Sequence, residues 1–362
     1  MTKPHLFEPI TIRDLTIDNR IWLSPMCQYS CFDGDGVATD WHLAHLGSFA
    51  IGGFGLLIAE ASAVRPDGRI TPHDTGIWND EQVAAWRRIT DFVHAQDSAI
   101  GIQLAHAGRK ASNHSPFDPR TGTVSVAEGG WSTVAPSAIA FEGFDPPREL
   151  TEPEIAELVG EFAEAARRAD SAGFDVVEIH AAHGYLFHQF YSPLSNVRTD
   201  GYGGDFAGRT RLLIETVDAV RDVWPDEKPL FVRISATDWT DGGWTVADSV
   251  ELATVLGEHG VDLVDVSSGG NVLADIPIGP GYQVAAAETI RRDAKIATAA
   301  VGLITEPAQA ETIVSTGLAD AVLLARAALR EPGWPLRAAH TLGLHPDDAP
   351  YRPQYRRGAW RR

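Results

Sequence analysis

Residues 153–180 read PEIAELVGEFAEAARRADSAGFDVVEIH, a predicted helix followed directly by a predicted strand. Apolar residues recur at helical spacing in the first part, where Thr151 is placed to cap the helix, Pro153 lies in its first turn and Gly173 ends it. The second part, DVVEIH at 175–180, is a short apolar and β-branched run typical of a buried strand. A helix that passes through a glycine into such a strand indicates the repeating unit of a parallel α/β sheet.

The same alternation of short apolar runs and helical patterns extends along the chain from Ile21. The candidate strands are IWLS (21–24), GLLIAE (55–60), IGIQLA (100–105), DVVEIH (175–180), LFVRIS (230–235), DLVDVS (262–267), KIATAA (295–300) and DAVLLA (320–325). Eight parallel strands are the number in a (β/α)8 TIM barrel, which at this length is one domain. We therefore predict an α/β TIM barrel over residues 1–345, with a long loop after strand 3 and a C-terminal tail at 346–362.

The composition bounds the possible functions. The chain has 362 residues, 44% of them hydrophobic, and its formal charge of −19 at pH 7 opposes binding to nucleic acid and to anionic lipid. A run of about 18 apolar residues, which a membrane helix requires, occurs nowhere, and the start MTKPHLFEPI lacks the apolar core of a signal peptide. We therefore expect a cytoplasmic protein with no membrane partner. Cys27 and Cys31 are too few for a four-cysteine iron–sulfur or zinc site.

Polar and small residues follow the predicted strands at their carboxyl ends, where TIM barrels carry their catalytic groups. In chain order they are Ser24-Pro25-Met26-Cys27-Gln28-Tyr29, Glu60-Ala61, Gln103 to His106, His180 to Tyr185, Arg233, Ser267 to Gly270, Gly302 and Ala325-Arg326. We expect these residues to meet at one rim of the barrel.

The ends of strands 7 and 8 are a recurrent phosphate site in such barrels, and Gly302 and Arg326 suit that role. The alternative is a turn glycine and a surface salt bridge. No GxGxxG follows any strand, so a dinucleotide-type flavin or a tightly bound NAD is not indicated. A mononucleotide fits the pattern better.

His180 and His183 stand at the end of strand 4, where two imidazoles can point at one ligand oxygen and stabilise the charge that develops on it. Tyr185 follows as a possible proton donor. A metal site is one alternative, but zinc needs a third ligand that the pattern does not offer, so we expect no metal. Structural histidines are the other alternative.

Gln103 and Arg233 are polar residues within apolar runs, and burying them without partners would be costly. A bound cofactor could supply those partners, because an amide can pair with a pyrimidine-like edge and a guanidinium can stabilise the negative charge of a reduced flavin. The alternative for Arg233 is an internal salt bridge with Glu178 or Asp265.

Several long stretches in this order resemble the old yellow enzyme family, specifically its thermophilic-like (class III) branch. They are SPMCQYS (24–30), EASAVRPDGRIT (60–71), GIQLAHAGRKA (101–111), FDVVEIHAAHGYLFHQFYSPLSNVRTDGYGG (174–204), LFVRISATD (230–238), the SSG after strand 6 and QYRRG (354–358). The resemblance covers nearly the whole chain. It implies an FMN-dependent ene-reductase in which NADPH or NADH reduces non-covalently bound FMN and leaves, after which an electron-poor alkene takes the hydride. Cyclic enones, maleimides and nitroalkenes are the expected substrates.

The resemblance also implies roles for single residues. Cys27 is expected near the pyrimidine side of the flavin, where it would tune the reduction potential. His180 and His183 would bind the carbonyl or nitro oxygen of the substrate, and Tyr185 would give Cα its proton. Tyr29 would help to shape the pocket, and Lys110 would assist at its mouth. The residues expected to hold FMN are Ser24, Pro25, Met26, Cys27, Ala61, Gln103, Arg233, Ser267, Gly270, Gly302, Ala325 and Arg326.

The tail suggests a shared site. The resemblance implies that Arg357 crosses a two-fold interface into the active site of a neighbouring subunit, which predicts a homodimer or a dimer-based oligomer. Two prolines stiffen this basic tail, which ends in Arg361 and Arg362, and make it too extended to pack back as a helix.

Some features of the chain depart from the family pattern or have no role in it. Ala325 stands where the family commonly has Gly, the loop at 112–135 with Trp131 is long, and Cys31 has no assigned role. The alternative of another class is a non-redox TIM barrel, either a metal hydrolase or a ligand-binding protein, which unlike a flavoprotein would not be yellow.

Overall fold

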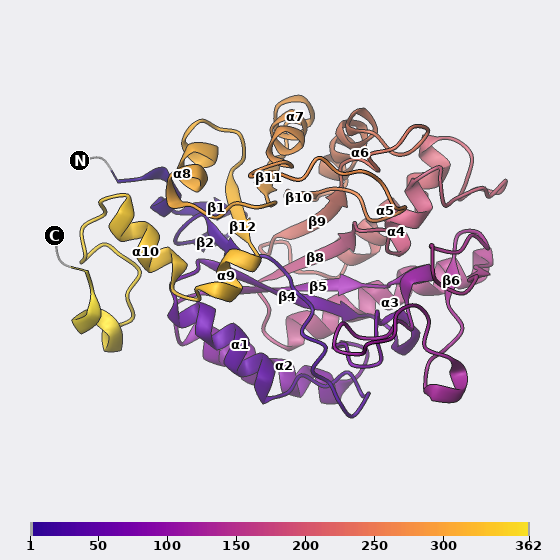
Figure 1. Cartoon of the computed structure of the whole chain (residues 1–362), viewed down its shortest axis with the longest axis horizontal. Coiled ribbons are helices and arrows are strands. Elements are labelled where there is room, and N and C mark those ends of the chain that lie inside the picture. The colour runs from indigo at the N-terminus through magenta and orange to yellow at the C-terminus, as the bar shows by residue number, and fades with distance from the viewer. Residues whose placement is uncertain (1–2, 361–362) are drawn as a thin grey trace.

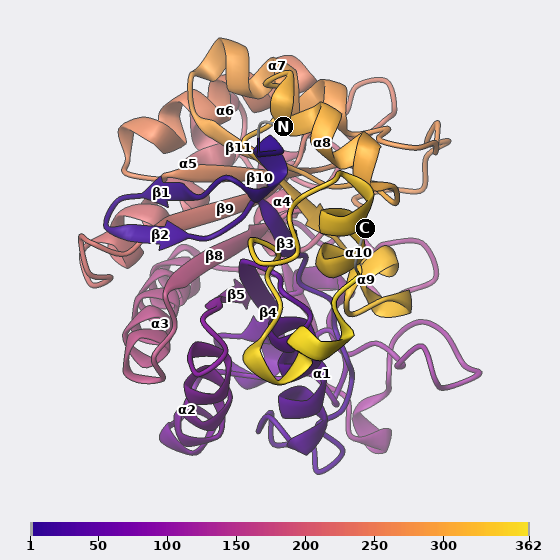
Figure 2. The ribbon, with the colours of Figure 1, turned by 90° about the vertical axis from the view of Figure 1, so that its left-hand side faces the viewer.

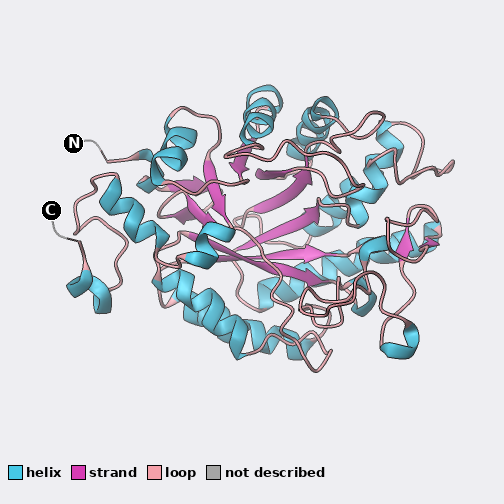
Figure 3. Cartoon of the chain, viewed as in Figure 1, coloured by secondary structure: helices cyan, strands magenta, loops and turns pink. Residues whose placement is uncertain are grey.

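The computed structural model describes residues 3–360 and shows a closed barrel of eight parallel strands in the order β10-β11-β12-β3-β4-β5-β8-β9 (Figure 1). Helices surround this barrel (Figure 3). The fold is the predicted single-domain TIM barrel. Arg361 and Arg362 lie outside the described residues.

The barrel strands are β3 (Ile21–Leu23), β4 (Leu56–Ala63), β5 (Ala99–Ala105), β8 (Val176–Ala181), β9 (Leu230–Ser235), β10 (Leu263–Ser267), β11 (Ala297–Ala300) and β12 (Ala321–Leu324). Two short pairs lie outside it, β1 (Ile10–Ile12) with β2 (Leu15–Ile17) and β6 (Val134–Ala135) with β7 (Arg148–Glu149). The helices are α1 (Asp40–Ile51), α2 (Asp80–His94), α3 (Glu152–Ser171), α4 (Leu186–Tyr191), α5 (Phe206–Arg221), α6 (Val246–Glu258), α7 (Val284–Ala294), α8 (Pro307–Ser315), α9 (Arg326–Arg330) and α10 (Trp334–Thr341).

All eight predicted strands are present, and their order around the barrel follows the chain. The segment at 153–180 folds as expected: Thr151 caps α3 in a capping box with Glu154, and Gly173 follows the helix with φ of +87° before β8 begins. The largest difference is in β4, which was predicted to end at Glu60 and continues to Ala63.

The barrel interior has an apolar floor at the amino ends of the strands. Trp22 and Phe231 stack there with ring centroids 5.9 Å apart, and Ile12 and Ile17 of the β1–β2 hairpin belong to the same apolar cluster. The hairpin therefore covers the amino end of the barrel, as Figure 2 shows from that side. Polar residues occupy the opposite, carboxyl end.

The C-terminal tail packs on the amino end of its own barrel, away from the carboxyl rim (Figure 2). The Arg352 guanidinium donates to the Ala50 carbonyl oxygen (2.9 Å) and to Ser98 Oγ (2.8 Å). Residues Pro353–Gly358 form a 3₁₀ helix, so the expectation of a tail too extended for helix was wrong: one of the two prolines, Pro353, starts this short helix in its first turn. None of the helices within residues 3–360 combines the length and the apolar character that crossing a membrane requires.

Candidate active site

His180, His183 and Tyr185 form an aromatic cluster at the end of β8. The His180 ring lies 5.2 Å from the His183 ring and 5.0 Å from the Tyr185 ring, centroid to centroid, and both contacts are edge to face. Burial and the charge of Arg233 lower the pKa of both imidazoles well below the ordinary value, so both are neutral. Burial also raises the pKa of Tyr185 well above its ordinary range, which keeps the phenol protonated.

Hydrogen bonds orient the two imidazoles. His180 Nδ1 accepts from the Ala182 N–H at 3.3 Å, so the proton of this neutral ring is on Nε2. His183 Nε2 lies 2.7 Å from Ser267 Oγ at the end of β10, and the His183 N–H donates to Ser235 Oγ at the end of β9. The ends of three neighbouring strands thus hold the pair.

Lys110 joins two rim loops. Its ammonium donates to the carbonyl oxygens of His183 (2.8 Å) and Gly270 (3.0 Å) and lies 5.2 Å from the centre of the Tyr185 ring. Burial lowers its pKa to about 8. A Cβ at Gly270 would lie 2.7 Å from the His183 carbonyl carbon, so the backbone at 270 can approach that at 183 this closely only because residue 270 is a glycine. Lys110 links the two segments through its hydrogen bonds to both carbonyl oxygens.

A layer of buried charged groups lies beneath this cluster. Gln103 Nε2 donates to Glu178 Oε1 at 2.7 Å, and Arg233 Nε lies 2.9 Å from Asp265 Oδ2, close enough for an ion pair but without hydrogen-bond alignment. Burial raises the pKa of Glu178 to about 8 and that of Asp265 to about 6, while Arg233 opposes both shifts. The salt bridge considered for Arg233 is therefore present, with Asp265 as its partner.

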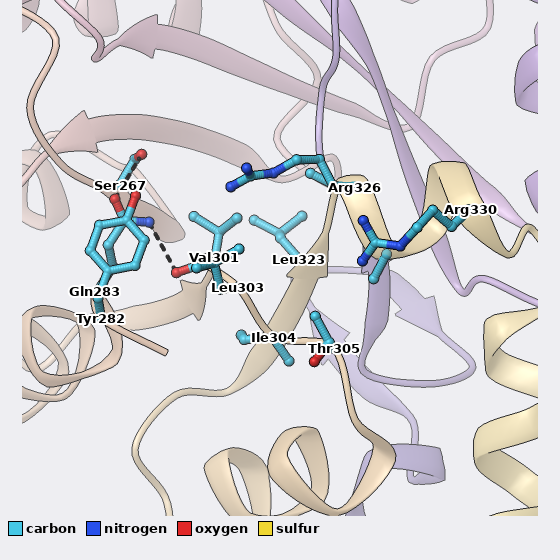
Figure 4. Close-up of a pocket in the computed structure, with 13 residues that line it drawn as sticks. Ser267, Tyr282, Gln283, Val301, Leu303, Ile304, Thr305, Leu323, Arg326 and Arg330 are labelled. Carbon is cyan, nitrogen blue, oxygen red and sulfur yellow. Dashed lines mark hydrogen bonds between the residues drawn. The ribbon is translucent and has the colours of Figure 1, made fainter. Parts of the chain in front are cut away.

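A pocket opens beside β11 and β12 (Figure 4). Arg326 and Arg330 reach it from α9, and Gln283 faces it from the other side, where its amide donates to the Val301 carbonyl oxygen at 3.0 Å and accepts from Ser268 Oγ at 2.7 Å. Gly302 lines the pocket with φ of +117°, and a Cβ there would lie 2.8 Å from Gln283 Nε2. The remaining lining residues are Ser267, Tyr282, Val301, Leu303, Ile304, Thr305, Leu323, Ala325 and Ala327.

The loop after β3 carries Ser24, which is buried, and Pro25, Met26, Cys27 and Tyr29, which are half-buried. Burial, with the negative charges of Asp74 and Glu60, raises the pKa of Cys27 well above its ordinary value, so the thiol is neutral. Tyr29 has φ of +53°, and its ring meets the exposed Phe117 ring edge to face at 6.1 Å.

Most of the predicted residues are therefore gathered at one rim, while Arg357 is not among them. It is exposed on the tail at the amino end of the barrel. Among residues 3–360, no three His, Cys, Asp or Glu side chains are grouped to hold a metal ion.

Sequence reasoning missed several residues that support the rim. Arg109 is 2% exposed and donates to the Ile139 carbonyl oxygen (3.1 Å) and to Asn271 Oδ1 (3.1 Å). His188 and Asp238 form a fully buried pair at 2.8 Å. Gln283 bonds both Ser268 and Val301. A signal for Arg109 was its position inside the conspicuous stretch GIQLAHAGRKA; Gln283 had none, because its partners are far away in the sequence.

The arrangement fits a flat mononucleotide with its phosphate near α9. Two arginines and the space left by Gly302 provide a place for an anion. At the other end, Gln103 directs an amide and Arg233 a guanidinium into the barrel, and the second oxygen of Glu178 has no hydrogen-bond partner among the described residues. A heterocycle with both donors and acceptors on its edge would satisfy such groups.

Comparison with known proteins gives consistent matches over the full barrel. The chain matches the NADH:flavin oxidoreductase / NADH oxidase family over residues 5–345. It is 51% identical to an NADPH dehydrogenase of Bacillus subtilis (strain 168), with 98% of each chain covered. The structure is similar to an old yellow enzyme homologue of Zymomonas mobilis, with a TM-score of 0.78, 30% identity and 93% of each chain covered. It is also similar to morphinone reductase, with a TM-score of 0.79 and 29% identity over 95% of this chain and 91% of that one.

Proposed function

Because this chain belongs to the NADH:flavin oxidoreductase / NADH oxidase family, we propose that it reduces the activated C=C bonds of enones, maleimides and nitroalkenes. The family and the NADPH dehydrogenase relative make it an FMN-dependent NAD(P)H oxidoreductase. They also set aside the non-redox alternative, a metal hydrolase or a ligand-binding barrel. The reduction of alkenes goes beyond the family assignment and is our proposal.

The observation that carries the proposal is the pair of buried, neutral imidazoles beside a protonated phenol. An activated alkene has a carbonyl or nitro oxygen that gains negative charge as hydride reaches Cβ, and the N–H groups of His180 and His183 would stabilise that oxygen. Tyr185 would then protonate Cα, since it retains its proton at neutral pH. Lys110 would hold this geometry through its two backbone carbonyls.

When bound, FMN accepts hydride from NAD(P)H and donates it to the alkene. We propose that Gly302, Ala325 and Arg326 hold its phosphate, and that Gln103 and Arg233 contact its pyrimidine edge. The neutral Cys27 thiol would lie near that edge and tune the reduction potential. Ser24, Pro25, Met26, Ala61, Ser267 and Gly270 complete the proposed binding set.

We propose further that the protein is a cytoplasmic homodimer, or a dimer-based oligomer, of the class III branch. Arg357 lies at the amino end of its own barrel, so it would reach a carboxyl rim only on a neighbouring subunit. The exposed Tyr355 and Trp360 beside it support burial of this tail in an interface.

Anaerobic titration tests the function directly. NADPH should bleach the flavin absorption, and cyclohexenone, N-methylmaleimide or nitrostyrene should restore it. Phenols should give a charge-transfer band that His180→Ala and His183→Ala each abolish, because the phenolate needs those donors. A flavin that NADPH reduces but that no alkene reoxidises would overturn the proposal of alkene reduction.

A further inference from the structure

Glu60 occupies a β-bulge at the carboxyl end of β4. In the pairing of β4 with β5, Ala59 lies opposite Ile102 and Ala61 lies opposite Gln103, so Glu60 is an extra residue on the β4 side. Bulges of this kind re-aim a side chain and are frequent beside active sites.

Because of the bulge, Ala61 takes the inward-facing position that Glu60 would otherwise occupy. Along β4, Leu56 and Ile58 belong to the apolar cluster inside the barrel, whereas Leu57 and Ala59 belong to the cluster shared with the helices. Regular alternation would put Glu60 inside with Leu56 and Ile58. Instead Ala61 packs in the small rim cluster that Cys27 and Tyr185 contact. A carboxylate is thereby replaced by a methyl group next to the proposed flavin.

The displaced Glu60 carboxylate is buried and joins the β3–α1 loop to α1. Its Oε2 accepts the Gln28 N–H at 2.7 Å, and its Oε1 lies 3.1 Å from His42 Nε2 on α1. His42 Nδ1 accepts the Thr39 N–H at 2.8 Å, so the proton of the neutral His42 ring is on Nε2, which makes a close polar contact with Glu60 without hydrogen-bond alignment. The side chains of His42 and Glu60 are 1% and 3% exposed, so water cannot take the place of either partner.

The residue that follows Gln28 needs such support. Tyr29 has φ of +53°, a left-handed conformation that strains a bulky side chain and persists only where neighbouring contacts enforce it. The Gln28 N–H held by Glu60 is one peptide unit away. Released from that bond, the loop could relax toward negative φ and turn the Tyr29 ring away from Phe117 and the rim.

We propose that Glu60, with His42, is a positioning pair that holds Tyr29 in its strained conformation at the substrate site. The pair acts on the substrate through Tyr29 and does not touch it. This inference rests on the proposed alkene reduction, because Tyr29 matters to the reaction only if a substrate binds there.

The test is Glu60→Gln in the FMN-loaded protein. A glutamine side chain keeps one acceptor oxygen and replaces the other with an NH2 donor, so a donor would face either the Gln28 N–H or His42 Nε2. Hydrogen exchange of the peptide that contains residues 24–30 should accelerate at least about tenfold, since the Gln28 amide loses a charge-assisted bond. The KM for cyclohexenone should rise about tenfold, with FMN content and the rate of flavin reduction by NADPH within about twofold of the parent.

A double-mutant cycle with Tyr29→Ala distinguishes an effect of Glu60 that acts through Tyr29 from a general loosening of the loop. If Glu60 acts through Tyr29, Glu60→Gln should add less than about twofold to the KM of Tyr29→Ala. An undiminished tenfold effect in that background would overturn the proposal, as would unchanged hydrogen exchange.

Asp74→Asn is the matched control, because Asp74 is also a buried carboxylate near Cys27 and Tyr29 but accepts from Ile70 and Thr71. Burial raises the pKa of Asp74 to about 7, so the comparison is made at pH 8, where this carboxyl is mostly ionised. Asp74→Asn should leave the cyclohexenone KM unchanged there; an equal rise would show that lost negative charge, not loop position, matters. Should the parent reduce no alkene at all, the proposed function fails, while the exchange measurement still decides the role of Glu60 in the loop.

Discussion

Glu178→Gln should change how the stability of the protein depends on pH. The carboxyl is fully buried, its Oε1 accepts from Gln103, and its Oε2 has no hydrogen-bond partner among the described residues. Glutamine has the same shape and can keep the bond to Gln103, so the substitution removes a titrating group with little change in packing.

The direction of this pH dependence follows from the burial of Glu178. Burial raises the pKa of Glu178 from 4.5 to about 8 in the folded protein, so the unfolded chain loses this proton at lower pH than the folded one. The free energy of unfolding therefore falls as pH rises from 4.5 toward 8. One pKa unit corresponds to about 1.4 kcal/mol, which gives an upper bound of about 5 kcal/mol for the loss. Coupling to Asp265 and Arg233 reduces it, and we expect about 2 to 4 kcal/mol.

Urea unfolding of the FMN-loaded protein, at a fixed concentration of free FMN, gives the measurement. Parent and Glu178→Gln should be equally stable near pH 4.5, and the variant should be the more stable of the two near pH 8.5 by the stated amount. Glu251→Gln, on the exposed face of α6, is the matched control and should follow the parent. Parallel pH profiles for parent and Glu178→Gln would refute the reasoning, because the carboxyl would then titrate alike in both states.

Three further substitutions address the site. Tyr185→Phe should slow alkene reduction about 100-fold and leave flavin reduction by NADPH intact in stopped-flow traces, since the hydroxyl only protonates Cα; equal losses would make Tyr185 structural. Gly302→Ala should raise the Kd of FMN about tenfold in a fluorescence titration, because its Cβ would meet Gln283 at 2.8 Å in a strained conformation. Gly279→Ala should leave the Kd of FMN unchanged, because nothing lies within 4 Å of its Cβ. Arg357→Ala should weaken substrate binding with the dimer retained in sedimentation, and unchanged kinetics would argue against a shared site.

The strands could be predicted from sequence because each is an apolar run that the barrel buries. LFVRIS at 230–235 coincides with β9, whereas KIATAA at 295–300 begins two residues early. Lys295 has φ of +56° and ends α7, so it cannot start a strand. The bulge at Glu60 had no signal, since a shift of register becomes visible only when β4 lies beside β5.

The grouping of the candidate site residues could be predicted where they are close together in sequence. His180 at the end of β8 lies within five residues of His183 and Tyr185 in the following turn, and the structure places their rings in contact. For Arg233, a polar residue in an apolar run predicted an ion pair with Glu178 or Asp265 but could not decide between them, because the two carboxylates lie on the strands at either side of β9. Arg109 and Asn271 are 162 residues apart, and only the closed barrel brings them together.

The β1–β2 hairpin covers the amino end of the barrel, so the two ends of the barrel can change separately during evolution. It seals an apolar floor around Trp22 and Phe231, while the candidate active site occupies the other end of the same strands. Changes of side-chain volume in the floor would alter the stability of the protein, and changes in the rim loops would alter the substrate that it accepts. A lineage could therefore gain heat tolerance without losing its reaction, and later change its reaction without losing its fold.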